Sequence, residues 1–455
     1  MSISKPISTF FAVAFATTGF LSFERFETAS PQIHAPEFLH INLDGEEVEL
    51  SLEDLGSGLR EASATVEVFG KNLKLMNRSF AGSLVFGEGP KSVKLKVRVV
   101  PKELGISEEG KFLLKLEASD WSWLTWWRGN ITKIEIPILV DLTPPSISSE
   151  KGLTYVRRGG SAVAVYTVSE KTKRSGVSID DEYFPGFLLP TDNVASGNRE
   201  NHNNRYISFF TLPWKAPVDS EIVLIAIDLA GNTSKVDFSA RVKEREFANV
   251  RITLPKTFID NKIPQLAAHL GRTPSDDSVK TFILINEEER FTNEAKIKEL
   301  VKATSSKRLW SGAFEQMRSS AVTSRYAENR TYFWEGEAVS RAIHSGYDLA
   351  STANAPIDAA NSGRVIFAGD MGIYGNCLLI DHGLGLFTLY AHLSQISVSV
   401  DQRVDKGFEV GRSGKTGLAG GDHLHFSVLV NGHYVDPKEW WDPKWVNDHV
   451  EKWLD

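Results

Sequence analysis

Three short segments in the last third of the chain carry polar side chains at alternating positions, and this spacing constrains the fold more than any other feature. They are His344-Ser-Gly-Tyr-Asp348, Leu389-Tyr-Ala-His392 and His423-Leu-His425. Residues two apart share a face of a β-strand, so each segment can present its polar side chains on one side of a sheet. The other face of the last strand would carry an apolar set suited to a core, namely Leu424, Phe426, Val428 and Val430.

The strand that ends near His392 is interpreted in the same way. We expect Thr388, Tyr390 and His392 to lie on its polar side. The packed side would then carry Leu389, Ala391 and Leu393. In the first segment, Gly346 would leave room for an ion between His344 and Asp348.

This arrangement predicts an open metal site. A catalytic zinc ion takes three protein ligands and keeps one position for water or substrate. His344, Asp348 and one histidine of the pair His423 and His425 can supply the three ligands. His392 and the remaining histidine would then be spare imidazoles beside the ion.

The motifs resemble those of the M23 family of zinc peptidases, of the lysostaphin and LytM type, over about residues 326–440. The matching pieces follow one another along the chain: His-x-Gly-x-Asp at 344–348, Tyr-Gly-Asn at 374–376, Ile-Asp-His-Gly at 380–383, Tyr-Ala-His-Leu-Ser at 390–394, Gly-Arg-Ser-Gly-Lys-Thr-Gly at 411–417, His-Leu-His-Phe at 423–426 and Val-Asp-Pro at 435–437. The resemblance implies a C-terminal antiparallel-β M23 peptidase domain at 326–455.

By this resemblance, His344, Asp348 and His425 bind zinc, while His392 and His423 are catalytic residues that make no bond to the metal. The implied activity is zinc-dependent hydrolysis of peptide cross-links or stem peptides of peptidoglycan in cell-wall remodelling. A histidine that is not a ligand can take up the proton of the attacking water and stabilise the oxyanion. A different function stays open, because some M23-like domains have lost zinc ligands and act as catalytically silent regulators that activate a cell-wall amidase.

Length and charge bound the rest of the chain. With 455 residues it is too long for one ordinary core, which predicts two to four domains. A net charge of −7 gives no indication of nucleic-acid binding. The single cysteine, Cys377, cannot form an internal disulfide. The sequence does not indicate an oligomeric state.

The N-terminus contains an uncharged run, Pro6–Phe23, that is rich in Phe, Ala and Val. Its length is near the lower limit for spanning a bilayer, and it also resembles the apolar region of an export signal. We expect residues 1–29 to act as a signal anchor rather than as a signal peptide that is removed, because no clean cleavage site follows Phe23. Either alternative exports the rest of the chain. We therefore expect it in the cell envelope, on the periplasmic side, anchored in the inner membrane.

Residues from about 32 to 245 have the pattern of β structure. Apolar and polar residues alternate in Ser92–Val100, Lys111–Glu117 and Lys133–Val140, as in half-buried strands. Pro144 and Pro145 cannot continue a strand ladder and mark a junction that resembles the one between tandem bacterial immunoglobulin-like domains. We expect two tandem β-sandwich domains of this type, at 30–142 and 143–248.

Between 249 and 325 the pattern becomes helical, which predicts a helical connector. Ile263–Leu270 and Asn286–Lys302 are expected to be helices. In the second helix, Phe291, Ile297 and Val301 would form the packed stripe together with Leu300, while Glu and Lys residues would face solvent. The expected fold class is therefore mainly β, with this connector between the sandwiches and the peptidase domain.

Overall fold

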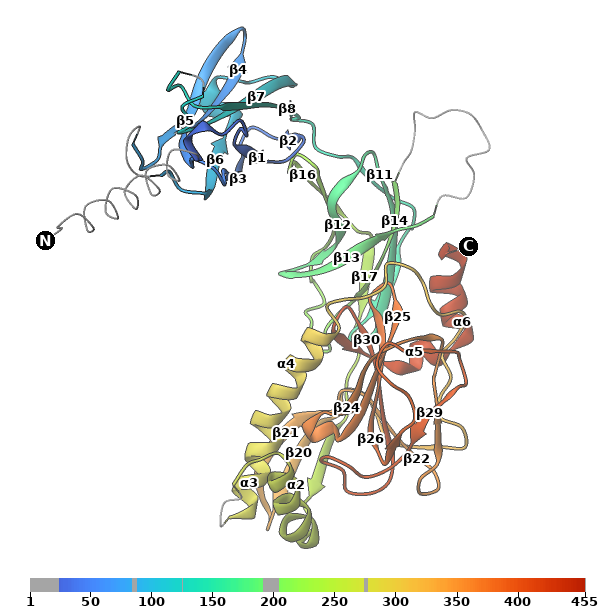
Figure 1. Ribbon diagram of the computed structural model, residues 1–455. Coiled ribbons are helices and arrows are strands. Elements are labelled where there is room, and N and C mark those ends of the chain that lie inside the picture. Colours follow the sequence, from blue (N-terminus) through green and yellow to red (C-terminus); the bar gives the residue numbers. More distant parts are fainter. Residues whose placement is uncertain (1–23, 84–87, 125, 191–203, 274–276, 455) are drawn as a thin grey trace, which may run out of the picture. The chain divides into compact units, whose positions relative to one another are not determined.

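A computed structural model of the protein describes residues 24–83, 88–124, 126–190, 204–273 and 277–454. The chain is mainly β, as predicted, and forms two compact units (Figure 1). The first unit contains Met1–Pro145 and Ile227–Thr233, and the second contains Ser146–Ala226 and Ser234–Asp455. The predicted membrane segment, residues 6–23, lies outside the described residues. None of the helices in the described ranges has both the length and the apolar composition needed to cross a bilayer.

Two sheets enclose the core of the first unit, with strand orders β1-β3-β6 and β2-β8-β7-β4-β5. Its elements are η1 (Glu24–Phe26), β1 (Gln32–His34), β2 (Leu39–Ile41), β3 (Glu46–Glu53), β4 (Leu59–Val68), β5 (Lys71–Ser79), β6 (Ser92–Val99), η2 (Pro101–Leu104), β7 (Gly110–Asp120) and β8 (Ile131–Val140). The three alternating segments of the sequence correspond to β6, β7 and β8. Their buried residues, such as Leu95, Leu116 and Ile138, pack in one cluster contributed by both sheets.

The second unit begins with a seven-stranded sheet of order β16-β15-β12-β13-β14-β11-β9 and a parallel pair, β10 and β17. These strands are β9 (Ile147–Ser149), β10 (Thr154–Arg157), β11 (Ser161–Val168), β12 (Thr172–Ile179), β13 (Glu182–Leu188), β14 (Asn204–Thr211), β15 (Ile222–Asp228), β16 (Thr233–Asp237) and β17 (Ala240–Lys243). The immunoglobulin-like character of the two N-terminal domains stays a prediction.

Strand β11 is buried along almost its whole length because it borders two cores. Ala164 and Tyr166 pack in the core of the seven-stranded sheet. Val163 and Val165 point the other way, into a core shared with the C-terminal domain. A strand covered on both faces needs apolar residues at every position, which explains the unbroken run Ser161–Val168.

Helices lie at residues 258–269 and 278–300. They are η3 (Phe258–Lys262), α2 (Ile263–His269), α3 (Ser278–Leu284), η4 (Ile285–Glu289) and α4 (Arg290–Leu300), and β18 (Asn249–Thr253) precedes them. On α4 and just beyond it, Ile297 and Val301 are buried as expected, whereas Phe291 is 77% exposed. The prediction was wrong for Phe291 because, at 3.6 residues per turn, it lies about 120° around the helix from Ile297.

The C-terminal domain is organised around a sheet of order β19-β22-β30-β26-β25-β24-β28, with β31 paired to β30. Its strands are β19 (Ala321–Ser324), β20 (Asn329–Trp334), β21 (Glu337–Ile343), β22 (Tyr347–Ala350), β23 (Pro356–Asp358), β24 (Gly363–Asp370), β25 (Asn376–Gly383), β26 (Leu386–Leu393), β27 (Gln395–Ile396), β28 (Arg403–Val404), β29 (Glu409–Arg412), β30 (Leu424–Val430) and β31 (His433–Val435). The helices are η5 (Gly372–Tyr374), α5 (Pro437–Trp441), α6 (Pro443–Val446), η6 (Asn447–Glu451) and α7 (Lys452–Leu454). Strand β18 joins this part of the chain by pairing in parallel with β20.

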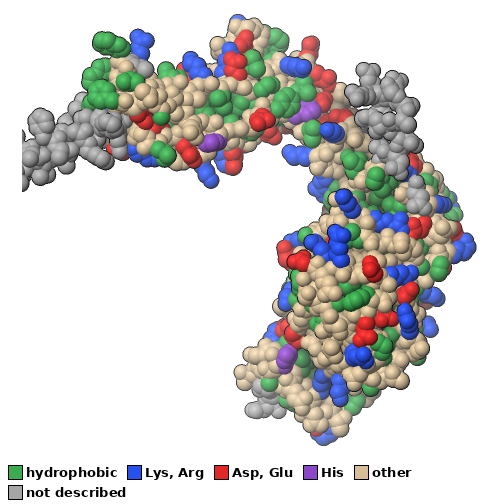
Figure 2. Space-filling model, turned by 45° about the vertical axis from the view of Figure 1, so that its right-hand side comes forward, with side chains coloured by type: hydrophobic (Ala, Val, Ile, Leu, Met, Phe, Trp, Pro, Cys, Tyr) green, Lys and Arg blue, Asp and Glu red, His purple; other side chains and the backbone are tan. Residues whose placement is uncertain are grey.

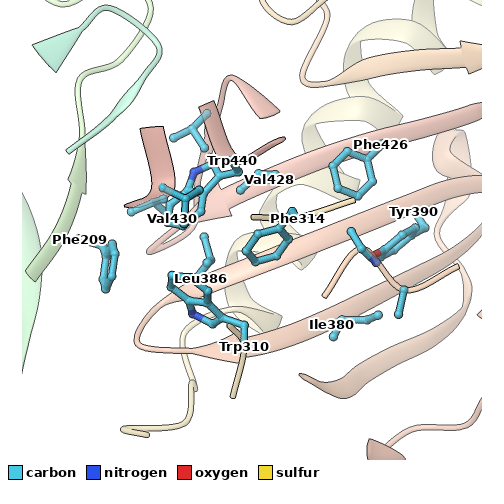
Figure 3. Close-up of a cluster of buried hydrophobic side chains, with 14 of the residues drawn as sticks. Phe209, Trp310, Phe314, Ile380, Leu386, Tyr390, Phe426, Val428, Val430 and Trp440 are labelled. Atoms are coloured by element: carbon cyan, nitrogen blue, oxygen red, sulfur yellow. The ribbon is translucent and has the colours of Figure 1, made fainter. Parts of the chain in front are cut away.

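One face of this sheet packs on β14 through large aromatic side chains (Figure 3). The ring centroid of Phe209 lies 6.1 Å from that of Trp440 and 6.5 Å from that of Trp310. The indole N–H of Trp440 donates to Ser161 Oγ at 2.9 Å. The opposite face of the sheet packs in part in a second core, which contains Phe387, Leu389 and Leu429 together with residues of the helices. On the surface seen in Figure 2, Lys, Arg, Asp and Glu side chains are interspersed.

His382 lies wholly inside the C-terminal domain and makes the stability of the folded protein depend on pH. Its Nδ1–H donates to the Ser362 carbonyl at 2.7 Å, and Nε2 lies 2.8 Å from Thr388 Oγ1. Burial lowers the pKa of His382 to about 4. In the unfolded chain a histidine protonates near pH 6.5 (about its ordinary pKa), so the unfolded state binds more protons between these values and stability falls as pH falls through this window.

We predict that His382→Gln lowers the free energy of unfolding overall. Between pH 7 and pH 5, however, the free energy of unfolding of the variant should fall by about 2 kcal/mol less than that of the parent. Urea unfolding of both full-length proteins in chelator measures this difference. Burial raises the pKa of Glu439 to about 7, which increases the stability of the folded state as pH falls. This contribution is present in both proteins, so variant and parent are compared at the same pH values. If the free energy of unfolding changed with pH in the same way in both proteins, His382 would not be the cause of this pH dependence.

Candidate metal centre and active site

Asp348 of β22 and His425 of β30 are direct neighbours across the sheet. Side chains at such positions share a face, with Cβ atoms about 5 Å apart. Asp348 Oδ1 lies 3.0 Å from His425 Nδ1 and 2.9 Å from His344 Nε2, and the two nitrogens are 3.0 Å apart. Three of the predicted metal-binding residues are thus brought together. His423 lies just outside this triangle, with Nε2 3.6 Å from Asp348 Oδ1.

The three converging atoms fit a bound metal ion. The Nδ1–H of His344 donates to the Arg325 carbonyl at 2.8 Å, so in the neutral ring Nε2 carries a lone pair that faces the triangle. His425 places Nε2 3.0 Å from Ser427 Oγ, which leaves Nδ1 for the ion. Two donors of a tetrahedral zinc site with bonds of about 2.0 Å lie about 3.3 Å apart. The three donor atoms, which are 2.9–3.0 Å apart, therefore need to move apart only slightly to hold a zinc ion.

His392 reaches the metal face by a route that the sequence does not reveal. Ala391 is the residue directly opposite His425, and Tyr390 is opposite Phe426 on the apolar face. The prediction that Thr388 and Tyr390 share the polar face is therefore wrong. His392 has φ +62°, a left-handed backbone that non-glycine residues rarely adopt, and this breaks the alternation of the strand. Its ring centroid consequently lies 5.9 Å from that of His425 and 4.9 Å from that of His423.

Gly346 also has a different role from the one expected. Residues 344–346 form no strand, because β21 ends at Ile343 and β22 begins at Tyr347. A Cβ at Gly346 would lie 2.2 Å from the Phe426 carbonyl oxygen. Glycine is required here because the chain passes directly against the backbone of β30, and not because an ion needs space.

The electrostatics of the site favour an anionic Asp348 beside neutral His392 and His425. Burial alone would raise the pKa of Asp348, but adjacent His344 and hydrogen bonds from His423 and His425 hold it well below its usual range. Burial lowers the pKa of His425 to about 4. Burial, with His423 and His425 nearby, also holds the pKa of His392 well below its usual value. For His423, burial is outweighed by the hydrogen bond and charge of Asp348, which raise its pKa.

The triangle opens into a cavity of about 560 Å³. On one side lie the histidines, and on the other lie residues that precede or belong to the helices, including Leu254, Phe258 and Lys262. Lys262 Nζ donates to the Lys415 carbonyl at 2.8 Å, and this hydrogen bond connects the two sides of the cavity. Arg330 also lines the cavity, where its Nη2 lies 3.0 Å from Asp348 Oδ2. The helices therefore form a wall of the site as well as connecting two domains.

Sequence reasoning missed the contribution of Glu294 on α4. Tyr374 OH donates to Glu294 Oε1 at 2.5 Å and lies 3.2 Å from Ser345 Oγ, which is itself 3.4 Å from His425 Nε2. Burial raises the pKa of Glu294. The solvated surface predicted for the acidic face of this helix is thus wrong at Glu294. No local pattern could show it, because the contact joins residues 80 positions apart.

Comparison with known proteins finds relatives of the C-terminal domain. Residues 342–437 match the sequence model of peptidase family M23. DD-carboxypeptidase/endopeptidase Mpg of Neisseria meningitidis serogroup B is 40% identical over 95 residues, which are 21% of this chain and 22% of that protein. Peptidoglycan DD-endopeptidase ShyA of Vibrio cholerae is 37% identical over the same shares, 21% and 22%. The catalytic domain of the antimicrobial peptidase lysostaphin from Staphylococcus simulans is 25% identical and covers 29% of this chain and 98% of that one, with a TM-score of 0.25. The matched region thus spans about a fifth of the length of the curated relatives, at 22%.

We predict that His344→Ala, Asp348→Asn and His425→Ala each lower the bound metal per chain at least about tenfold, because a site with three protein ligands cannot lose one and keep its affinity. Elemental mass spectrometry of the purified variants measures this. The matched control is Asp401→Asn, whose side chain is 78% exposed in the same domain. A folded variant that keeps the parental metal content removes its residue from the ligand set.

Proposed function

Because residues 342–437 form a peptidase family M23 domain, we propose that the protein is a zinc-dependent endopeptidase that hydrolyses peptide cross-links or stem peptides of peptidoglycan. Two relatives of the matched region, Mpg and ShyA, are named as endopeptidases, and ShyA as a peptidoglycan DD-endopeptidase. The proposed zinc ligands are His344, Asp348 and His425. Two imidazoles and one carboxylate with a fourth position open are the ligand set of a hydrolytic zinc site.

The observation that carries the proposal is the orientation of two further histidines beside this set. The Nδ1–H of His392 donates to the Thr416 carbonyl at 2.9 Å, and the Nδ1–H of His423 donates to the Gly421 carbonyl at 2.9 Å. Each tether fixes the ring orientation and leaves Nε2 as the atom that can exchange a proton. A domain that only binds a partner has no need of spare imidazoles held in this way.

The chain's own residues can then perform the steps of peptide hydrolysis. A bound zinc ion would supply Lewis acidity toward the scissile carbonyl and lower the pKa of a water molecule. In this proposal His392 and His423 would take up the proton of that water at Nε2, donate hydrogen bonds to the developing oxyanion, and return a proton to the leaving amine. Tyr374 and Ser345 would orient His425 from behind, as partners of metal-bound histidines commonly do.

The proposed substrate also determines where the protein works. Peptidoglycan lies outside the cytoplasmic membrane, so we propose the cell envelope, on the periplasmic side, as its location. Anchoring to the inner membrane through residues 1–23 stays a prediction from the sequence.

We predict that His392→Ala and His423→Ala keep their zinc but lose about 10²–10⁴-fold of the cleavage rate, the usual effect of removing a positioned acid–base group. Zinc content and the release of peptides from purified peptidoglycan are measured on the same preparations, with Asp401→Asn as control. If His423→Ala loses its zinc, the roles of His423 and His425 are exchanged. A zinc-loaded parent that cleaves no peptidoglycan but activates a cell-wall amidase would identify the silent regulator instead.

A further inference from the structure

The first unit contains a separate group of convergent oxygen atoms. The carboxylates of Glu27, Asp54 and Asp120 each place an oxygen within 4.8 Å of the others. They come from three distant segments: the stretch after η1, the turn after β3 and the end of β7. Asp54 is 5% exposed and Asp120 is 0% exposed. Two buried carboxylates and a half-buried one at this separation repel one another strongly unless a positive charge or many hydrogen bonds compensate them.

Hydrogen bonds compensate only part of this charge. Asp120 accepts from the backbone N–H groups of Ser122 and Asn130 at 2.8 and 2.6 Å and from Asn130 Nδ2 at 2.9 Å. Glu27 Oε1 accepts from the Ser57 N–H at 2.5 Å. Asp54 Oδ1 accepts from the Gly56 N–H at 2.8 Å.

Two cations lie near the cluster and bond to backbone carbonyls. Arg25 donates to the Trp121 carbonyl and Lys91 donates to the Gly56 carbonyl. Within the described ranges, no ion pair reaches Glu27, Asp54 or Asp120.

A second observation points to a ligand in the same turn. Asp54 Oδ2 and Ser57 Oγ are buried and have no hydrogen-bond partner. The Glu27 carboxylate lies directly on this turn, since a Cβ at Gly56 would be 1.3 Å from Glu27 Oε2. Buried oxygen atoms of this kind normally have a hydrogen-bond partner. The turn therefore presents unsatisfied oxygens beside a carboxylate cluster.

We propose that Glu27, Asp54 and Asp120 bind a divalent cation of the calcium class. The available donors are all oxygens, which excludes a site built for a softer metal. Calcium accepts six to eight oxygens in flexible geometry, whereas magnesium demands a near-ideal octahedron. Ser57 Oγ and water can complete the coordination. The ion would tie the stretch around Glu27, which directly follows the predicted membrane segment, to the first sandwich.

Terbium luminescence on the full-length, zinc-loaded protein tests this site. Terbium replaces calcium at oxygen sites, and Trp121, next to Asp120, is placed to sensitise its emission. We expect saturable emission that Ca²⁺ displaces at concentrations up to about the millimolar range and that Mg²⁺ displaces more weakly. Asp54→Asn and Glu27→Gln should each weaken binding at least about tenfold. The control, Asp44→Asn, changes an exposed acid of the same unit and should bind as the parent does.

Circular dichroism shows whether each variant is folded. If Asp54→Asn does not fold, Glu27→Gln tests the site instead, because Glu27 is only half-buried. Absence of saturable emission from the folded parent would overturn the proposal. Emission that survives in folded Asp54→Asn and Glu27→Gln would overturn it as well, because the ion would then bind elsewhere. Neither outcome bears on the proposed peptidase activity, which is measured separately.

Discussion

The pairing of Asp348 with His425 across β22 and β30 is the constraint on which the candidate active site depends. It brings a carboxylate and an imidazole from positions 77 residues apart to 3.0 Å. The same register places Phe426, Leu424 and Val428 on the opposite face, inside the large core. A slip of one residue would turn His425 into that core and Phe426 into the site, so the hydrophobic packing holds the proposed metal ligands in register.

The sandwich domain that precedes the helices contributes to this constraint. Strand β14 presents Phe209 to Trp440 and Trp310, and Trp440 is fully buried between the two domains. Glu439 accepts a hydrogen bond from the Ser161 N–H at 2.7 Å in the same place. Because the apolar face of the peptidase sheet is covered by β11 and β14, the sandwich domain and the peptidase domain share one core.

The sequence allowed the regular parts of this fold to be predicted, because alternation is a local signal. Strands β6, β7 and β8 lie where the pattern placed them, and the convergence of His344, Asp348 and His425 agrees with the family resemblance. Departures from regular structure were not predictable. The left-handed backbone at His392 overrides its alternation, and the chain at Gly346 is shaped by contact with β30. Contacts between distant segments, such as Glu294 with Tyr374, or Glu27 with Asp54 and Asp120, leave no mark on local spacing.

We propose that one zinc ion is held by His344, Asp348 and His425 while His392 and His423 remain unbound. Anomalous diffraction at the zinc edge from crystals of the full-length protein measures this directly. We expect one peak about 2.0–2.2 Å from His344 Nε2, His425 Nδ1 and Asp348 Oδ1, with the Nε2 atoms of His392 and His423 beyond bonding distance. A peak bonded to His423 or His392 in place of any of these three, or no peak in this triangle, would contradict it.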